Sequence, residues 1–568
     1  MGVVNQQLPT SADAFRDASW ADIEPYFREL AERPLDEENV EQWLADWSDL
    51  ESLVSEAGSL AYFAYSCNTA DPAAETAQLR HDSEIGPKAQ QARSRLQERL
   101  IELGYTRPGL QTVLERFRNQ IELFRDENVP VNSELSKLET EWAKVIGAMT
   151  VEWNGETKTP PQLLPYLESS DRDERERAFK LRAQAYMEQR DVLARIFDQM
   201  LDLRQQLGKN AGFDNYRDFI HREKNRFDYT PQDCYRFHDA VEEVMRPVCA
   251  RILQRRQEGL GVDALRPWDL NVDPSGRPAL KPFADDRELI ERTSVVVGHL
   301  DEDFRGYINK MAAAGLLDLD NRKGKAPGGY STSLNYRKMP LIFMNAVGID
   351  DDVRTLIHES GHAFHSFEAS RLPLLFQRHP GHEMAEVASM SMELLSSPYI
   401  SKESGGYYSE EDARRSNRIA LEGVILFFPH CASVDAFQQW IYTEADGRDA
   451  DARDQKWLEL RRRFEADVVD WSGLDRERIA RWYQQPHFFG NPFYYIEYGI
   501  AQLGALQVWR NSLKDRTGAV RDYRSALALG ATERLPDLYA AAGARLIFDA
   551  KGMQELADLV EEHLADLN

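Results

Sequence analysis

The chain contains few cysteines, and they are widely separated. Cys67, Cys234, Cys249 and Cys431 form no CxxC pair within the 568 residues. A disulfide framework or a thiolate zinc site would need grouped cysteines, so neither is indicated. We expect four free thiols in a reducing compartment, which favours a cytoplasmic location.

Long apolar runs and an excess of basic charge are also missing. The N-terminal sequence has no basic region followed by an apolar one, and we find no apolar stretch that approaches the length of a membrane span. The formal net charge of -26 would repel phosphate backbones and anionic lipid head groups. We therefore expect neither nucleic acid nor a membrane as partner, and short peptides or small molecules stay open. The oligomeric state is not indicated, and a monomer is compatible with the sequence.

Helical periodicity is abundant. Apolar residues recur at spacings of three and four along most of the chain, whereas strand signals are confined to "MTVEW" at 149–153 and to a stretch at about 326–348. The sequence predicts a mainly α protein with a small β-sheet. We place an N-terminal helical domain at 1–205 and a second domain, which contains the predicted sheet, at 206–568.

The stretch "TLIHESGHAFHSFE" at 355–368 carries the clearest chemical pattern. The acidic residues just before it, with Asp350 as cap, predict a helix at about 351–368. Histidines four residues apart on a helix face the same way, so His358 and His362 can direct ring nitrogens at one metal ion. Glu359 lies beside that position and could take a proton from a metal-bound water.

The alternative is a pair of histidines on an ordinary helix face. Gly361 weighs against it, because glycine inside a helix costs about 0.5–1 kcal/mol relative to alanine and indicates close approach of another element.

A second predicted helix, at about 382–397, offers a third ligand. Glu386 lies in a run of small and apolar residues, where a carboxylate is unfavourable unless it is paired or binds a metal. Glu393 lies two turns further on the same face and could accept a hydrogen bond from a ligand histidine, although a plain surface charge explains it equally well. We assign His365 to packing or hydrogen bonding, because a catalytic zinc keeps one position open. The expected cofactor is one Zn²⁺ ion per chain.

At this point several motifs together resemble one family. They are "HESGHAFH" with "AEVASMSMELL", "RPWDL" at 266–270, "NRKGKAPGGY" at 321–330, "HFFGNPFYYIEYG" at 487–499 and "NYRDFIHREKNRFDYTPQDC" at 215–234. The chain resembles the oligoendopeptidase F and thimet-type zinc oligopeptidases over most of its length. The shorter helical members of the oligoendopeptidase F branch are the most similar.

The resemblance implies zinc ligands His358, His362 and Glu386, with Glu359 as general base. It also implies a two-lobed helical shell around an internal channel that admits short unstructured peptides, with a small sheet beside the helix that carries HExxH. Ser360 stands where the family often has a bulky apolar residue. Ala501 replaces a further tyrosine of thimet-type relatives, which leaves fewer candidate oxyanion donors.

Phenol and imidazole groups suit the stabilisation of an oxyanion. On the residues alone, the aromatic cluster at 487–499 is more often core than catalytic. The resemblance favours His487 and Tyr498 as donors and adds Tyr494, while Tyr495 stays with the core. The "GNP" after the histidine predicts a loop.

Two stretches are candidates for contact with a substrate. "MPLIFMNAVG" at 339–348 is either an edge strand to which a peptide adds, with Phe343, Met344 and Asn345 as contacts, or an ordinary buried strand. The glycine-rich stretch before it lacks the arrangement of a phosphate loop, and we expect it to be a flexible or substrate-contacting loop with Tyr330 as a contact.

The main hypothesis is a zinc-dependent endopeptidase that hydrolyses internal bonds of short peptides. One alternative is a metallo-carboxypeptidase or dipeptidase on a similar shell. A non-catalytic peptide-binding protein is a more distant alternative, because a structural zinc normally has four protein ligands.

Overall fold

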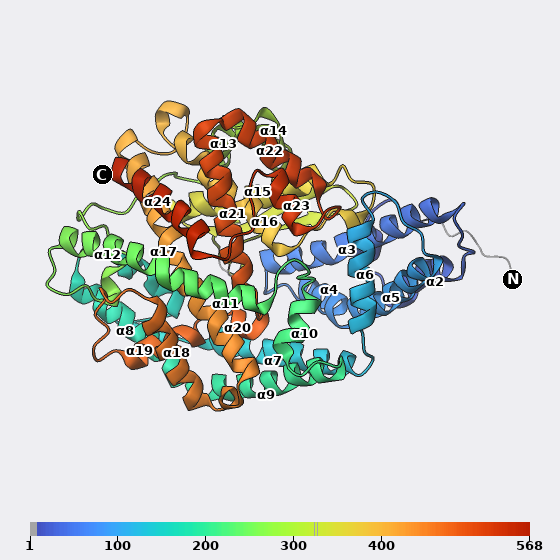
Figure 1. The fold of residues 1–568 in the computed structure, drawn as a ribbon, viewed down its shortest axis with the longest axis horizontal. Coiled ribbons are helices and arrows are strands. Elements are labelled where there is room, and N and C mark those ends of the chain that lie inside the picture. Colours follow the sequence, from blue (N-terminus) through green and yellow to red (C-terminus); the bar gives the residue numbers. More distant parts are fainter. Residues whose placement is uncertain (1–7, 323, 327, 568) are drawn as a thin grey trace. The chain divides into compact units, whose positions relative to one another are not determined.

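A computed structural model describes residues 8–322, 324–326 and 328–567 of the chain (Figure 1). Helices predominate and the strands form only small sheets, so the predicted mainly α class is confirmed. The chain divides into two compact units, each assembled from separated stretches. Unit 1 contains 1–124, 280–416 and 501–546, and unit 2 contains 125–279, 417–500 and 547–568.

Unit 1 begins with amphipathic helices around an apolar core that includes Trp43, Trp47 and Phe117. A pair of helices and a sheet follow, then the two helices that carry the HExxH and glutamate motifs. The helices within unit 1 are α1 (Asp13–Arg16), α2 (Trp20–Glu32), α3 (Val40–Cys67), α4 (Pro72–Arg80), α5 (Gly86–Leu103), α6 (Gln111–Leu123), α13 (Asp286–Gly298), α14 (Glu302–Ala313), α15 (Asp350–Ala369), α16 (His382–Ser396), α22 (Arg516–Leu529) and α23 (Leu535–Ala541).

The described residues of unit 2 are mainly helical, with one β-hairpin. Strands β1 (Val151–Trp153) and β2 (Glu156–Lys158) pair antiparallel, as the "MTVEW" signal predicts. The helices within unit 2 are α7 (Asn128–Ala148), α8 (Arg172–Glu188), α9 (Arg190–Asn210), α10 (Tyr216–Glu223), α11 (Pro231–Ala240), α12 (Arg246–Leu260), α18 (Ala450–Phe464), α19 (Asp475–Tyr483), α20 (His487–Gly490) and α24 (Ala550–Asp566).

Two long helices pass from one unit to the other, α17 (Glu410–Thr443) and α21 (Tyr495–Lys514). Helix α17 is long and apolar enough to cross a membrane by length and composition, with a mean hydropathy of 1.4 in its most apolar window. The expectation that no apolar stretch approaches that length is therefore wrong. However, 61% of the window is buried inside the protein, which is also typical of a core helix.

The three-stranded sheet of unit 1 has the order β3-β5-β4. Strand β3 (Leu317–Asp320) runs parallel to β5 (Met339–Ala346), and β4 (Tyr330–Leu334) runs antiparallel to it. Because β5 is hydrogen-bonded on both sides, it is the central strand, and the possibility that it forms an edge is wrong.

Helix α15 follows β5 and begins within one residue of the prediction, but its capping residue differs from the predicted one. Asp352, not Asp350, binds the preceding backbone: its Oδ2 accepts hydrogen bonds from the amides of residues 347, 348 and 349 at 2.7–2.9 Å. Asp350 accepts instead from the hydroxyls of Tyr408 and Ser416. A carboxylate in the first turn also interacts favourably with the helix dipole.

Helices α15 and α16 pack against each other at Gly361. A Cβ atom at this position would lie 2.6 Å from the carbonyl oxygen of Ala388 and 2.6 Å from the Cα of Ser389. Such distances are far below van der Waals contact, so only glycine permits this approach. The close element that Gly361 indicated is thus the backbone of α16.

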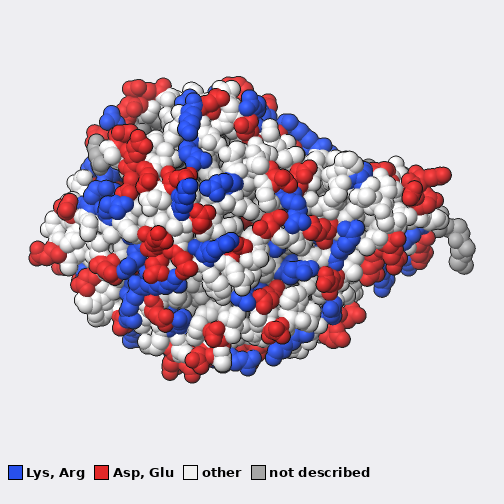
Figure 2. All heavy atoms as spheres, in the orientation of Figure 1, with Lys and Arg blue, Asp and Glu red and all other residues white. Residues whose placement is uncertain are grey.

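Charged side chains connect helices that are distant in sequence. On the face drawn in Figure 2, Lys and Arg side chains lie among Asp and Glu side chains. In unit 1, Arg524 of α22 pairs with Asp301, with Asp303 of α14 and with Glu368 of α15 at 2.5–2.7 Å. Ion pairs of this kind tie the surface helices to the helix that carries the histidines.

The domain division at residue 205 stays a prediction, since the compact units follow contacts rather than sequence order. The predicted sheet at 326–348 corresponds to β4 and β5, and β3 lies before it.

Candidate metal site and its surroundings

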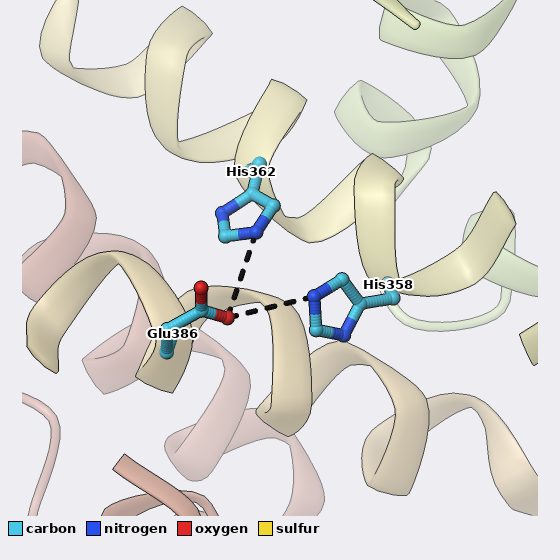
Figure 3. A group of neighbouring side chains, drawn as sticks. All are labelled: His358, His362 and Glu386. Carbon is cyan, nitrogen blue, oxygen red and sulfur yellow. Dashed lines mark ion pairs between the residues drawn. The ribbon is translucent and has the colours of Figure 1, made fainter. Parts of the chain in front are cut away.

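Three side chains of unit 1 form a compact group of potential metal ligands (Figure 3). His358 and His362 project from one face of α15 toward Glu386 on α16. Their Nε2 atoms lie 3.5 Å and 3.6 Å from the same carboxylate oxygen, Glu386 Oε2. The sequence thus identified three side chains that the fold brings together.

The spacing of these atoms fits a tetrahedral zinc ion. Ligand bonds of about 2.0–2.1 Å at tetrahedral angles separate neighbouring donor atoms by about 3.3 Å. Two imidazole nitrogens and one carboxylate oxygen are also a donor set that catalytic zinc uses. The three residues are therefore suited to hold Zn²⁺ with a fourth position left for another group.

The electrostatics of the group also favour a cation. Burial raises the pKa of Glu386, but the neighbouring His362 and His358 lower it to about 2. Burial lowers the pKa of His358, whereas hydrogen bonds to Glu386 and Glu393 raise it well above its usual range. The buried carboxylate of Glu386 thus stays ionised, and its negative charge attracts a cation to the space beside His358 and His362.

Glu393 lies where a supporting carboxylate is expected. Its Oε1 is 2.7 Å from Nδ1 of His358, on the far side of the ring from Glu386. Such a bond holds a ligand histidine in the orientation and tautomer that leave Nε2 for the metal. Ser389 adds a second support, because its hydroxyl donates to Glu386 Oε2 at 2.9 Å.

Glu359 is buried beside the group, and its Oε2 has no hydrogen-bond partner. Burial raises the pKa of this carboxyl group. A buried carboxyl oxygen without a partner is unfavourable, and carboxyl groups with perturbed pKa values are more frequent at functional sites than elsewhere.

His365 follows on the same helix but is not part of the group. It is buried, its Nε2 has no hydrogen-bond partner, and burial lowers its pKa to about 3. It is a neutral packed side chain, in line with the assignment to packing.

The residues of β5 that were predicted to contact substrate pack or form hydrogen bonds within unit 1. Phe343 and Met344 are buried, and Nδ2 of Asn345 donates to the carbonyls of Ala326 and Gly328. Tyr330 on β4 stacks on Phe343, with ring centroids 5.1 Å apart. Whether any of these four residues contacts a substrate stays a prediction.

The glycine-rich stretch before β4 is attached to the sheet by a buried lysine. Nζ of Lys325 donates to Oδ1 of Asp318 and to the carbonyls of Asp318, Asp320 and Met344 at 2.6–3.1 Å. These bonds satisfy every donor of the ammonium group, so this part of the stretch is anchored.

In unit 2, three predicted oxyanion donors lie together. The ring of His487 is 5.8 Å from that of Tyr494 and 6.1 Å from that of Tyr498, and the two phenol rings are 4.7 Å apart. His487 begins the short helix α20 and Tyr498 lies in the first turn of α21, with the predicted loop between them. Tyr494 lies just before α21.

Buried arginines hold α20 and the loop after it. Arg204 donates to Tyr442 Oη at 3.0 Å and to the carbonyls of Phe488 and Phe489. Arg226 pairs with Glu497 and donates to the carbonyl of Phe493 at 2.5 Å.

Phe493 has a positive φ of 61°, which costs a non-glycine residue about 1–2 kcal/mol. Its amide donates to Gln438 at 3.0 Å, and its carbonyl accepts from Arg226. Strain of this kind persists where surrounding bonds hold the backbone on both sides.

Sequence reasoning missed Gln485 and His430. Nε2 of Gln485 lies 2.6 Å from Nδ1 of His487, and its Oε1 lies 3.2 Å from Nε2 of His430. Gln485 precedes His487 by two residues, so its proximity could have been noted. No spacing rule links either residue to His430, which lies on α17.

Family models match most of the chain. Residues 165–558 match the model described as peptidase family M3, and residues 14–107 match the peptidase M3 N-terminal domain. An oligoendopeptidase F homolog of Lactococcus lactis is 22% identical over 56% of this chain and 51% of its own length. The oligopeptidase PepF of Bacillus subtilis is 23% identical over 52% of this chain and 43% of its own length. The matched part of the chain thus spans about half the length of these curated relatives.

Solved structures match over nearly the full chain. A PZ peptidase A with a bound inhibitor has a TM-score of 0.86 and 25% identity, covering 100% of this chain and 99% of its own. An oligoendopeptidase F from Enterococcus faecium has a TM-score of 0.66 at 16% identity, covering 98% of both chains, which shows the fold alone.

Proposed function

We propose that this chain, which belongs to peptidase family M3, is a zinc-dependent oligoendopeptidase that hydrolyses internal bonds of short, unstructured peptides. The observation that carries the proposal is the group formed by His358, His362 and Glu386, with the buried Glu359 beside it, whose Oε2 has no hydrogen-bond partner. Family membership supports peptide hydrolysis in general, and this group supports its metal-dependent form.

His358, His362 and Glu386 would hold the zinc ion. Bound in such a site, zinc lowers the pKa of a water molecule toward about 7 and polarises a carbonyl group. Glu393 fixes the ring of His358 through Nδ1, and Ser389 fixes the carboxylate of Glu386.

Glu359 would act as the general base. It takes a proton from the attacking water and later passes it to the leaving amine. Its raised pKa suits this task, because a proton acceptor works best when its pKa lies near the working pH. Proton transfer by a positioned side chain contributes about 10²- to 10⁴-fold in rate.

His487 and Tyr498, with Tyr494 as a third candidate, would donate hydrogen bonds to the oxyanion that forms when the carbonyl is attacked. Their clustering within unit 2 supports a shared role. Each such donor is worth about 10²- to 10³-fold in rate.

Main-chain recognition would explain how peptides of different sequence bind. Of the described strands in this sheet, β3 and β4 each have a partner on one side only, and β4 carries Tyr330, one of the predicted substrate contacts. A peptide that adds to the other side of β4 would be recognised by its backbone more than by its side chains. This assigns to β4 the role that the sequence suggested for β5.

A peptide blocked at both ends and internally quenched tests the proposal. We expect cleavage at an internal bond, loss of cleavage with a chelator and recovery when zinc is added. Cleavage that requires a free terminus would favour the carboxypeptidase or dipeptidase alternative. Binding of zinc and peptide without any cleavage would favour a non-catalytic binding protein.

The cysteines bear on the location. Cys67, Cys234, Cys249 and Cys431 are all free, and three of them are buried. Free thiols support the proposal of a reducing, cytoplasmic compartment.

A further inference from the structure

Gln485 lies between two histidines of unit 2 and is hydrogen-bonded to both. Its Nε2 is 2.6 Å from Nδ1 of His487, and its Oε1 is 3.2 Å from Nε2 of His430. The hydroxyl of Tyr495 also donates to Oε1, at 3.3 Å. Gln485 itself is buried, so these contacts form away from bulk water.

The donor and acceptor in each of these hydrogen bonds follow from Arg461, which is bonded to the other side of His430. Nδ1 of His430 lies 2.9 Å from Nη1 of Arg461. A guanidinium group has only donors, so Nδ1 of His430 must accept. The proton of the neutral ring is then on Nε2, which donates to Gln485.

The same reasoning settles the orientation of the Gln485 amide. If its nitrogen faced His430, Nε2 of that ring would also have to accept, and a neutral imidazole cannot accept at both nitrogens. The oxygen of Gln485 therefore faces His430 and Tyr495. Its NH₂ group faces His487 and donates to Nδ1.

Charges around His430 keep its ring neutral. Burial lowers the pKa of His430 well below its usual range, and the positive charges of Arg461 and Arg481 add to this effect. Arg461 is held in turn by Glu465, which also pairs with Arg478 and Arg481. The guanidinium group of Arg461, which donates to His430, is thus fixed in place.

We propose that Gln485 is a positioning residue that holds His487 as the neutral tautomer with its proton on Nε2. This inference rests on the proposed function in one respect, the role of His487 as a donor to the oxyanion. With Nδ1 accepting from Gln485, the Nε2–H of His487 is the ring's remaining donor. A ring whose tautomer is already fixed needs no change of its protonated nitrogen when the oxyanion forms.

Nitrogen NMR of ¹⁵N-histidine-labelled protein tests the tautomer without any activity. Long-range proton–nitrogen correlations distinguish a ring protonated on Nε2 from one protonated on Nδ1. The His487 signals are identified by their loss in His487→Gln. We expect the Nε2–H pattern at pH 7, and an Nδ1–H pattern or an even mixture would overturn the proposal.

Two substitutions separate positioning from a merely structural role. Gln485→Glu keeps the size of the side chain and its acceptor for His430 and Tyr495, but turns the donor toward His487 into an acceptor. Gln485→Leu removes all three bonds and leaves His487 able to adopt either tautomer. We expect kcat to fall about 10²-fold for Gln485→Glu and about tenfold for Gln485→Leu, with little change in KM.

A structural role predicts the opposite order, because leucine breaks more bonds than glutamate. The proposal fails if Gln485→Glu is as active as Gln485→Leu or more active. Gln484→Glu is the matched control, since it makes the same chemical change one residue away on a partly exposed side chain, and we expect wild-type activity.

The NMR result also separates this inference from the proposed function. If the wild-type protein cleaves no peptide but His487 shows the Nε2–H pattern and loses it in Gln485→Glu, the hydrogen-bond arrangement stands and the peptidase proposal falls. If the wild type is an active peptidase and His487 shows the Nδ1–H pattern, the peptidase proposal stands and the positioning role of Gln485 falls.

Discussion

The metal group of unit 1 and the His487 segment of unit 2 are built in different ways. In unit 1, His358, His362 and Glu386 lie on two neighbouring helices that are close in sequence and pack directly. In unit 2, the segment from Gln485 to Tyr498 combines a short helix, a loop with a positive φ and the start of a long helix.

The partners that fix each region also differ. Glu393 and Ser389, which are hydrogen-bonded to the candidate metal ligands, lie on α16 itself. Arg204 and Arg226, which hold the unit 2 loop, are more than 260 residues away from the carbonyls that they bind. A site on two rigid helices depends on few contacts, whereas a loop site depends on many distant ones.

The largest effect is expected at the general base. Glu359→Gln keeps the size of the side chain but cannot take a proton, so kcat for a blocked peptide should fall about 10²- to 10⁴-fold. Zinc content, measured by metal analysis, should stay at one ion per chain. Appreciable residual turnover with zinc bound would contradict the assignment of Glu359.

A buried ion-pair cluster should control the stability of unit 2 and leave the metal group unaffected. Glu465 pairs with Arg461, Arg478 and Arg481, and Glu465→Gln would leave buried arginines without a counter-charge. We expect the free energy of unfolding in urea at pH 7 to fall by about 3–5 kcal/mol, with zinc affinity unchanged. Glu459→Gln on α18, the helix that ends just before Glu465, is the control, because an exposed pair contributes about 0–1 kcal/mol.

The effect of Glu465 should depend on pH in a defined direction. Burial raises the pKa of Glu465, but the three arginines lower it to about 2, below its ordinary value of 4.5. A lowered folded-state pKa stabilises the protein fully above about pH 4.5, and the contribution is lost as the pH falls toward 2. The stability difference between wild type and Glu465→Gln should therefore shrink below pH 4.5, and a constant difference down to pH 2 would refute this account.

A smaller effect, confined to the metal group, is expected at Glu393. Removing the carboxylate that binds Nδ1 of His358 should weaken zinc binding about 10- to 100-fold in Glu393→Gln, as measured by competition with a chelator. The exposed Glu403 provides a control for the loss of one negative charge. Equal zinc affinity in Glu393→Gln and Glu403→Gln would mean that Glu393 is only a surface charge, which is the alternative that the sequence left open.

The smallest effect concerns the contact between the two helices. Gly361→Ala places a methyl group against the backbone of α16 and should destabilise the protein by about 1–3 kcal/mol, with weaker zinc binding as the helices separate. Gly306→Ala on α14 meets no atom within 4 Å and should instead stabilise it by about 0.5–1 kcal/mol. Thermal unfolding of both variants measures this difference. Equal shifts of the unfolding temperature in the two variants would mean that α15 and α16 are not in tight contact at Gly361.

Particular residues show where prediction from sequence succeeded and where it failed. The helix that carries HExxH begins at Asp350, within one residue of the prediction, but its start is stabilised by Asp352. Acidic residues at 350, 351 and 352 are equivalent by composition, and only the path of the preceding loop selects among them. Similarly, the apolar sequence of β5 did not reveal whether a second strand lies beside it.

By itself, the sequence determined the mainly helical class and the helix with two histidines on one face, because helical periodicity and residue spacing are local properties. It singled out Glu386 by its small, apolar neighbours, but the packing of α16 on α15 brings that residue to the histidines. Only the tertiary structure decided which strand is central, which carboxylate caps α15 and how Gln485 links His487 to His430 and Arg461. These features depend on contacts between distant segments, and a hydrogen bond between residues far apart in sequence leaves no periodic signal in either of them.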